Sequence, residues 1–312
     1  MRELKSLDLN LLVSLDALLR ERSVTRAADR LGLSQPSLSA ALAKLRRHFR
    51  DELLVRRGNQ YEWTPLAVQL NERVTVALDG ASRVFAVQPD FDPSTAVHQY
   101  TLLSSDYSLA VLGQVIAGLL AERAPRISVR WDQVTTAAVD DASSSLRAVD
   151  GLIVPRGFIT AVPHQDLYVD EWVCVGAVDN PLVGDSLTFE DLGRLPWVLT
   201  FHDRTAYSAP AQQMRLLGIE LNVQMVIHGY LAVPHLLVGS NRLALLQGHL
   251  ARQVAGPGSG LRVLTLPFEP VALVSALWWH PMYERDPQHI WLRSLLAEAG
   301  TLLTAAQHHQ ID

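Results

Sequence analysis

Short polar side chains gather at the start of one expected helix, and their types suit hydrogen bonding to a polar partner. Ser34, Gln35, Ser37 and Ser39 lie there, with Pro36 in the first turn, where a missing N–H costs nothing. Hydroxyl and amide groups at a helix N-terminus, together with the free backbone N–H groups, can contact bases and phosphates in the major groove of DNA. The chemistry that this cluster predicts is recognition of a nucleic acid.

Three expected helices position this cluster. The first covers residues 8–21; the second covers residues 24–31 and ends at Gly32, where a left-handed residue stops a helix without steric cost. The third is capped by Ser34 and continues along an apolar stripe. Small Ala28 lets the second and third helices approach closely. This spacing predicts a helix-turn-helix.

Basic side chains accompany this helical module. Residues 1–60 carry twelve Lys and Arg against seven acids, and two short strands with a turn are expected over residues 53–63. Five cations on the third helix and the first strand are candidates for phosphate contacts, which position a protein on DNA without specifying sequence; they are Lys44, Arg46, Arg47, Arg56 and Arg57. The alternative, an ordinary helical hairpin with a solvated charged face, explains the spacing, the basic balance and the following strands less well.

The net charge of −5 over 312 residues averages two regions of opposite sign. Residues 1–88 hold fourteen cations and ten acids, a balance of +4, whereas residues 89–312 hold thirteen cations and twenty-two acids, a balance of −9. A negative total therefore does not exclude a polyanionic partner of the N-terminal part.

Composition also sets the compartment and excludes some chemistry. Cys174 is the single cysteine, so no disulfide framework or cysteine zinc site is expected, and eleven histidines lack metal-ligand spacing. No apolar run is long enough for a membrane span. We expect a cytoplasmic protein with no metal site and no membrane partner.

The region beyond the boundary expected at residues 89–93 alternates strand-like and helical runs. The expected strands are residues 100–104, 127–131, 151–154, 173–178, 197–200, 223–227, 243–246, 262–266 and 272–278, and the expected helices are 108–122, 210–217, 233–238 and 289–303. This alternation predicts α/β architecture with mainly parallel sheets. Before it, a long helix after Thr64 carries an apolar stripe that a small winged domain cannot bury alone, which favours dimerisation.

The N-terminal motif resembles that of LysR-type transcriptional regulators. The residues that carry the resemblance are Ala27, Ala28, Leu31, Leu33, Ser34, Gln35, Pro36 and Ser39, and the tail Trp278-Trp-His-Pro281, Asp286-Pro287 and Trp291-Leu-Arg293 is typical of the branch that includes nodulation and aromatic-degradation activators. The resemblance covers essentially the whole chain. One departure is Ala40, where many members carry an arginine.

The resemblance implies an N-terminal all-α winged helix-turn-helix with a long linker helix, and a C-terminal α/β effector module of two subdomains similar to a type 2 periplasmic binding protein. We expect the winged domain at 1–63, the linker at 64–88, a hinge at 89–97, subdomain I at 98–160 and 267–312, and subdomain II at 161–266. Implied partners are a double-stranded DNA operator, a small-molecule effector in place of a cofactor, and a second copy in dimers that pair into tetramers. RNA polymerase is a further candidate partner.

Ligands of open α/β sheets bind beyond the carboxyl ends of strands, where helix N-termini attract anions. The side chains expected at this edge, or at the first crossing between subdomains, are Ser104, Ser105, Thr135, Arg156, Thr200, Phe201, His202 and His228. For each of them, a cap, core or surface role is the alternative. The branch implies an aromatic or other small organic acid as the effector.

Catalytic signatures are missing from the sequence. Gly256-Pro-Gly-Ser-Gly260 resembles a phosphate loop only in composition, because Leu261 replaces the last glycine and a proline interrupts it. We therefore expect a regulator that is not an enzyme. The alternative of another class is a cytoplasmic solute-binding or enzymatic α/β protein that merely carries an N-terminal helical hairpin.

Overall fold

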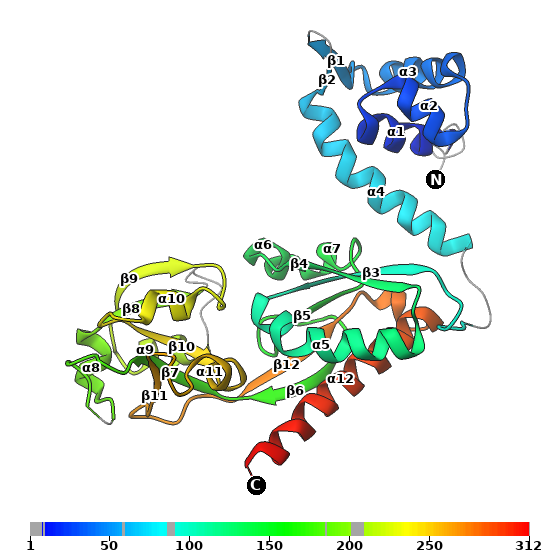
Figure 1. The fold of residues 1–312 in the computed structure, drawn as a ribbon. Coiled ribbons are helices and arrows are strands. Elements are labelled where there is room, and N and C mark those ends of the chain that lie inside the picture. The colour runs from blue at the N-terminus through cyan, green and yellow to red at the C-terminus, as the bar shows by residue number, and fades with distance from the viewer. Residues whose placement is uncertain are drawn as a thin grey trace. The chain divides into compact units, whose positions relative to one another are not determined.

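The computed structural model describes residues 8, 10–57, 60–85, 91–184, 186–200 and 209–311. The chain divides into two compact units, Met1–Gln88 and Pro89–Asp312 (Figure 1). The first unit contains α1 Asn10–Glu21, α2 Val24–Leu31, α3 Gln35–Phe49, β1 Leu54–Arg57, β2 Gln60–Trp63 and α4 Pro65–Phe85. The two strands pair antiparallel as a hairpin after the third helix, which completes a winged helix-turn-helix.

The ends of α2 and α3 follow from their capping residues. The side chain of Ser23 accepts a hydrogen bond from the backbone of Arg26 at 3.3 Å, and Ser34 accepts one from the backbone of Ser37 at 3.3 Å. Between the helices, Gly32 has φ 64°, a conformation that glycine adopts without a Cβ penalty. The predicted turn is confirmed.

The core of the first unit also explains the stripe on α4. Leu15 and Leu18 of α1 and Leu38 of α3 are fully buried, and Ala67 and Val74 of α4 are buried in the same cluster. Leu70 and Leu78 of the expected stripe are partly buried against this cluster, and α4 contacts α1. This part of the stripe therefore packs on the helices of its own chain.

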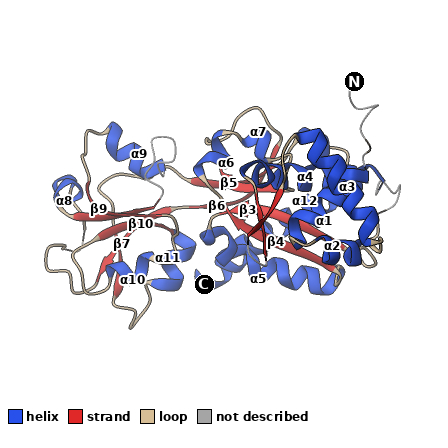
Figure 2. Cartoon of the chain, turned by 90° about the horizontal axis from the view of Figure 1, so that it is seen from above, coloured by secondary structure: helices blue, strands red, loops and turns tan. Residues whose placement is uncertain are grey.

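The second unit has two lobes, each built on a five-stranded sheet. The first lobe contains β3 His98–Ser104, α5 Asp106–Arg123, β4 Ile127–Gln133, α6 Thr136–Asp140, α7 Ala142–Ser145, β5 Gly151–Pro155, β6 His164–Asp170, β12 Leu273–Trp278, η2 Pro281–Tyr283 and α12 Pro287–Ile311. The second lobe contains β7 Trp172–Ala177, α8 Phe189–Arg194, β8 Pro196–Thr200, α9 Ala209–Leu216, β9 Asn222–Ile227, α10 Val233–Leu237, β10 Leu243–Gln247, α11 Gly248–Val254 and β11 Leu261–Leu264. Figure 2 shows the strands of the two sheets as separate groups with helices around each.

Both sheets are mixed, which differs from the mainly parallel sheets expected. The first has the order β4-β3-β5-β12-β6, with β3 parallel to β4 and β5 but β12 antiparallel to β5 and β6. The second has the order β11-β7-β10-β8-β9. In it, β8 is parallel to β10 and β9, whereas β7 is antiparallel to β11 and β10. The antiparallel pairings arise where the chain passes from one lobe to the other.

The first passage between lobes lies later in the chain than sequence analysis placed it. Residues 164–170 form β6, an edge strand that pairs with β12 in the first sheet, so the chain enters the second lobe at Trp172. The polar start of this strand, His164, Gln165 and Asp166, hides its strand character in the sequence. The expected boundary at residue 160 falls before this strand.

Helix α12 closes the first lobe against β6 and α5. Arg123 on α5 forms two hydrogen bonds to the carboxylate of Glu298, at 2.7 and 2.8 Å. At Gly300 a Cβ would overlap the carbonyl oxygen of Leu167, so glycine is needed for the helix to approach the strand. Among the described helices, none combines the length and apolar character that a membrane crossing requires.

Candidate functional site

The start of α3 presents an exposed polar surface. Gln35, Pro36, Ser37 and Ser39 are exposed, while Leu38 between them is fully buried in the core of the first unit. The hydroxyls of Ser34 and Ser37 lie 2.7 Å apart and hold each other in the cap. The amide of Gln35 has no hydrogen bond within the described part of the protein, so it can bond to an external partner.

The five candidate cations divide by what their guanidinium or ammonium groups contact. Arg46 bonds to the carbonyl oxygens of Glu52 at 2.9 Å and of Leu54 at 3.0 Å, and thereby ties α3 to the hairpin. Arg57 pairs with Glu62 across the hairpin at 3.3 Å. Lys44, Arg47 and Arg56 are exposed, and within the described residues neither Lys44 nor Arg47 forms an ion pair. Exposed cations with no internal partner are the ones best placed to meet phosphates.

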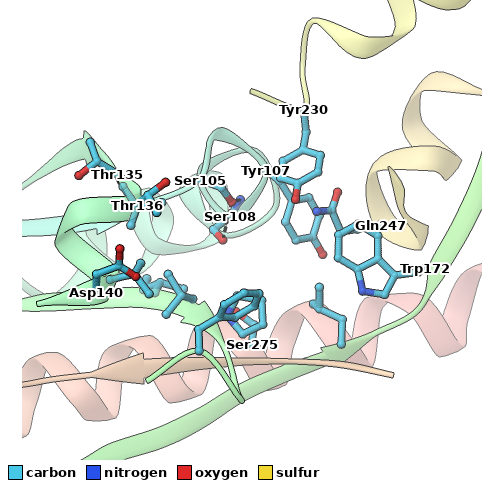
Figure 3. A pocket seen from close by; sticks show the side chains of 17 residues that line it. Ser105, Tyr107, Ser108, Thr135, Thr136, Asp140, Trp172, Tyr230, Gln247 and Ser275 are labelled. Atoms are coloured by element: carbon cyan, nitrogen blue, oxygen red, sulfur yellow. Dashed lines mark hydrogen bonds between the residues drawn. The ribbon is translucent and has the colours of Figure 1, made fainter. Parts of the chain in front are cut away.

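A pocket lies between the two lobes of the second unit, with an empty volume of about 780 Å³ including its open mouth (Figure 3). Its lining is mostly apolar, with hydroxyl and amide groups at intervals. The first lobe contributes Ser105, Tyr107, Ser108, Val134, Thr135, Thr136, Val139, Asp140, Ile153, Val154, Pro155, Phe158, Leu273 and Ser275, and the second lobe contributes Trp172, Tyr230 and Gln247. A concave, mostly apolar lining with a few polar groups is typical of a site for a small organic molecule.

Two of the predicted effector residues line this pocket. Ser105 caps α5 by accepting a hydrogen bond from the backbone of Ser108 at 3.3 Å, and Thr135 caps α6 by accepting one from Ala138 at 3.2 Å. Both follow the carboxyl end of a strand, as the rule for open sheets requires. Ser104 precedes them and is buried, with its hydroxyl bonded to the carbonyl of Ser105 at 2.9 Å.

The remaining predicted residues lie outside the pocket or outside the described residues. Thr200 lines a smaller neighbouring cavity of about 180 Å³, which shares Trp172 and Tyr230 with the pocket. Arg156 pairs with Asp166 at 3.3 Å on the surface. His228 is exposed, and its carbonyl accepts a hydrogen bond from Gln133 at 3.1 Å. Phe201 and His202 fall outside the described residues.

The three side chains that the second lobe contributes to the pocket were not among the predicted effector residues. Gln247 ends β10, so the rule that located Ser105 also covers it. Trp172 begins β7, directly after the passage between lobes, and this position could not be recognised because β6 was not expected. Tyr230 lies in a loop after β9, where the sequence carries no signal of its contact with the pocket.

The carboxylate of Asp106 joins the two lobes at the edge of the pocket. It accepts hydrogen bonds from the backbone N–H groups of Tyr230 at 2.9 Å and Leu231 at 3.0 Å, and we call this contact the Asp106 latch. At Gly229 a Cβ would lie 2.7 Å from the Asp106 carboxylate, so the close approach depends on glycine. The latch fixes the second-lobe loop that carries Tyr230.

A second polar contact joins the lobes where the chain passes between them. Tyr107 donates a hydrogen bond to Asp170, and the Nδ1 of His249 lies 2.8 Å from the same carboxylate. Burial acts to raise the pKa of Asp170, but hydrogen bonds from His249 and Tyr107 and the charge of His249 outweigh it and lower the pKa. Burial, with the nearby Tyr168 and Asp170, raises the pKa of Tyr107, so its hydroxyl stays a proton donor. The passage between lobes is therefore built around a carboxylate.

A winged helix-turn-helix together with a two-lobed α/β unit that encloses a pocket defines a ligand-responsive DNA-binding regulator. Over residues 9–68 the chain matches the family described as "Bacterial regulatory helix-turn-helix protein, lysR family", and over residues 103–301 it matches the "LysR substrate binding domain". The chain belongs to the LysR family and is a DNA-binding transcriptional regulator with an effector-binding domain.

Relatives and solved structures agree with this family. Nodulation protein D 2 of Rhizobium tropici is 33% identical over 305 residues, which cover 96% of this chain and 95% of that protein. Nodulation protein D 1 of Rhizobium meliloti (strain 1021) is 33% identical over 301 residues, covering 95% and 96%. The crystal structure of a probable transcriptional regulator from Pseudomonas aeruginosa superimposes with a TM-score of 0.71 at 26% identity, covering 95% of this chain and 98% of that chain. Full-length CbnR, solved in complex with its target DNA, shares the fold with a TM-score of 0.64 at 15% identity, covering 95% and 100%.

Proposed function

We propose that the chain reads a DNA operator with the start of α3 and binds its effector in the pocket between the two lobes. The observation that carries the effector site is the lining of the pocket, which both lobes supply and which is mostly apolar. A molecule that contacts Ser105 on one side and Gln247 on the other stabilises the closed arrangement of the lobes. The larger the difference between the ligand's affinities for the closed and open arrangements, the further binding shifts the population toward the closed one.

For the DNA site, base readout belongs to Gln35, Ser37 and Ser39, with Ser34 and Pro36 shaping the start of the helix. Phosphate contacts belong to Lys44, Arg47 and the hairpin residues Arg56 and Arg57. Arg46 contributes by holding the hairpin against α3 through its bonds to Glu52 and Leu54. This division separates residues that specify a sequence from residues that position the protein.

The proposal includes an assembly and a compartment. Helix-turn-helix modules bind half-sites in pairs, so the operator-bound form is a dimer, with α4 as the linker and dimers pairing into tetramers. Control of transcription brings the bound protein to RNA polymerase, and access to the chromosome places it in the cytoplasm. Effector binding changes the packing of dimers and the bend of the DNA. The pocket serves binding and not catalysis.

The domain limits proposed from sequence need one change. We retain the winged domain at 1–63, the linker at 64–88 and the hinge at 89–97. We propose that the first lobe spans 98–170 and 267–312, because β6 pairs within its sheet. The second lobe then spans 172–266.

Binding of the upstream intergenic DNA by wild-type protein and by Gln35→Ala tests the DNA site. Titrations followed by fluorescence anisotropy, at low and physiological salt, compare that DNA with random DNA of equal length. If Gln35 reads bases, its loss costs about 1–3 kcal/mol of discrimination. Gln69→Ala, at an exposed glutamine of α4, is the matched control and keeps full discrimination.

The outcomes of this test separate the hypotheses. An equal loss of affinity on both DNAs would contradict base readout by Gln35 and leave only a positioning role. If the folded protein shows no salt-sensitive binding at low salt, the proposal fails, and the solute-binding or enzymatic alternative is favoured.

A further inference from the structure

We propose that the buried carboxylate of Asp170 fixes the angle between the two lobes, and that Tyr107 links this carboxylate to the wall of the pocket. Tyr107 and His249 are its positioning residues, one from each lobe. The proposal rests on the effector site only where it makes the pocket the place from which a ligand acts on Tyr107. Three features of the described residues lead to it: the bonds of the carboxylate, its burial, and the position of Tyr107 in the pocket wall.

The carboxylate of Asp170, at the end of β6, accepts bonds from both lobes where the chain passes between them. Its Oδ2 accepts a hydrogen bond from the hydroxyl of Tyr107 on α5 and another, at 3.2 Å, from the backbone N–H of His249 on α11. The Nδ1 of His249 lies 2.8 Å from the same oxygen. The Oδ1 accepts a hydrogen bond from the backbone of Glu171 at 2.8 Å. One side chain therefore bonds to the first lobe, to the passage and to the second lobe.

The backbone around this carboxylate fits closely as well. The N–H of Gly248 donates to the carbonyl of Glu171 at 2.9 Å, so two successive N–H groups hold the start of α11 against the passage. A Cβ at Gly248 would lie 3.0 Å from the Oδ1 of Asp170 and 2.7 Å from the Cγ of Glu171. A rotation of one lobe against the other turns the backbone of residues 170–172 and strains these bonds. The contacts therefore resist changes in the angle between the lobes.

The cluster is shielded from water, which strengthens its hydrogen bonds. The side chain of Asp170 is 1% exposed and that of His249 is 6% exposed. The ring of Tyr168 packs beside the cluster, with its centroid 6.4 Å from that of Tyr107 and 5.9 Å from that of His249. Burial opposes the ionisation of Asp170, but hydrogen bonds from His249 and Tyr107 lower its pKa, so it remains a carboxylate. A buried carboxylate that loses a donor is poorly compensated, so each of its bonds matters.

Tyr107 connects the carboxylate to the pocket. It is 2% exposed and lines the pocket, and its ring centroid lies 6.3 Å from that of Tyr230 in the second lobe. Figure 3 shows Tyr107 among the lining side chains, beside Tyr230 and Gln247. A tyrosine hydroxyl has a single proton to donate. A ligand that shifts the ring of Tyr107 therefore weakens the bond to Asp170 and loosens the passage between the lobes.

This role differs from that of the Asp106 latch. The latch bonds a loop of the second lobe at the edge of the pocket, where a loss of contact lets the lobes separate. Asp170 lies where the chain crosses between the lobes, close to the axis about which they turn. It therefore limits the range of angles that the lobes adopt. A distance measured between the lobes should change in its mean when the latch is lost, and in its width when the bonds of Asp170 are lost.

Pulsed electron paramagnetic resonance on the full chain tests the role of Asp170. Spin labels attached through Ala137→Cys on α6 and Glu190→Cys on α8 report one distance distribution between the lobes. Tyr107→Phe removes a single hydroxyl. It should raise the fraction of molecules outside the wild-type range at least about tenfold, the effect of losing one hydrogen bond to a charged group. His249→Ala should have the same effect, whereas His249→Asn keeps an N–H donor near the position of Nδ1 and should restore the wild-type width.

Tyr100→Phe is the matched control for Tyr107→Phe. Tyr100 is also a buried tyrosine of the first lobe, and its hydroxyl donates to the carbonyl of Gln288 at 2.9 Å. The control therefore removes a buried hydrogen bond whose two partners both belong to the first lobe. It should leave the width of the distance distribution unchanged.

Hydrogen exchange followed by mass spectrometry tests the link between the pocket wall and the passage. The backbone N–H of His249 belongs to the second lobe, and its acceptor is Asp170. Tyr107→Phe, a change in the first lobe, should therefore speed exchange in a peptide that covers residues 245–252 several-fold. Tyr100→Phe should leave exchange in the same peptide unchanged.

These measurements use no ligand, so they separate the proposal from the effector site. A wild-type width in both Tyr107→Phe and His249→Ala would overturn the role of Asp170, as would equal widening in Tyr100→Phe, and the effector site would still stand. Unchanged exchange in Tyr107→Phe would overturn the link to the pocket wall. If His249→Ala does not fold, Tyr107→Phe alone decides between these outcomes, because it removes a single oxygen atom.

Discussion

His289 is a titratable side chain buried in the first lobe, away from the effector pocket. It is 1% exposed, its Nε2 lies 2.6 Å from the carbonyl oxygen of Asp150, and its ring stacks on Tyr283 at a centroid distance of 5.0 Å. Burial lowers the pKa of His289, although the hydrogen bond to Asp150 opposes the shift. The histidine is therefore neutral in the folded protein at neutral pH.

This lowered pKa predicts a loss of stability in mild acid. The folded pKa lies below the unfolded value of about 6.5, so the unfolded chain takes up the proton first as the pH falls. The stabilisation is complete above about pH 6.5 and decreases below it. His289→Gln keeps a donor toward Asp150 without the titration, so it should flatten the decline in the free energy of unfolding between about pH 6.5 and pH 5.

Urea unfolding at several pH values measures this decline. Leu292→Ala, at a fully buried leucine of the same helix, lowers the free energy of unfolding by about 2–5 kcal/mol at every pH and keeps the wild-type slope. A slope in His289→Gln equal to that of the wild type would show that another group causes the acid sensitivity.

At the level of single residues, the sequence predicts pocket side chains that follow a strand and cap a helix. Ser105 and Thr135 are found in this way, and Gln247 lies at the carboxyl end of β10 but forms no capping hydrogen bond with its side chain. Trp172 and Tyr230 could not be found, because their positions depend on how the two lobes face each other. Contacts made by tertiary placement leave no local pattern in a single sequence.

Between elements, the Asp106 latch joins the start of α5 to the loop after β9. Its geometry requires a glycine, because a Cβ at Gly229 would lie 2.7 Å from the Asp106 carboxylate. The two backbone N–H groups that it accepts from belong to the opposite lobe. The latch therefore contributes only while the lobes are close together, and it favours the closed arrangement.

Gly229→Ala should separate the lobes at the pocket mouth. We expect a longer distance between spin labels attached through Ala137→Cys and Glu190→Cys. Cys174 is buried in β7, so the labels attach selectively at the new positions. In Gly184→Ala, where a Cβ would meet nothing within 4 Å, the label distance stays the same.

If Gly229→Ala leaves the label distance unchanged, the Asp106 latch does not hold the lobes together. The complementary change, Asp106→Asn, keeps one acceptor oxygen and weakens the latch without adding bulk. It should give a smaller shift in the same direction.

Most elements of the fold could be predicted from sequence, and the exceptions share a cause. The helices of the first unit follow from apolar spacing and from caps such as Ser34 and Gly32. By contrast, β6 begins with polar residues because it is an edge strand, and its pairing with β12 joins positions more than 100 residues apart. A single sequence reveals local periodicity but not which distant strand completes a sheet.

At the scale of the whole molecule, charge separates the two units. Residues 1–88 carry a balance of +4 and residues 89–312 a balance of −9. Binding to DNA releases counterions in proportion to the number of phosphates that the protein contacts. The slope of log affinity against log salt therefore reports how many cationic side chains contact phosphates. Cations of the first unit should contribute to this slope, and charges of the second unit should not.

Substitutions of the adjacent residues Arg47 and Arg46 distinguish a cation that contacts phosphate from one that stabilises the fold. Arg47→Ala should reduce the slope of log affinity against log salt by about 0.9, the value for one phosphate contact. Arg46→Ala should instead lower the free energy of unfolding by about 1–3 kcal/mol, because it removes bonds to the carbonyls of Glu52 and Leu54. Asp179→Asn, at an exposed acid of the second unit, should leave the slope unchanged; an unchanged slope in Arg47→Ala as well would contradict a phosphate contact there.

Helix α12 sets the order in which the protein can fold during synthesis. It packs against β6 and α5, and its Glu298 binds Arg123, 175 residues earlier in the chain. The first unit has its own core and is complete once residue 88 has left the ribosome. The first lobe must wait for Pro287–Ile311. Each newly made molecule therefore passes through a period in which its DNA-reading part is folded while the part that senses the effector is unfinished.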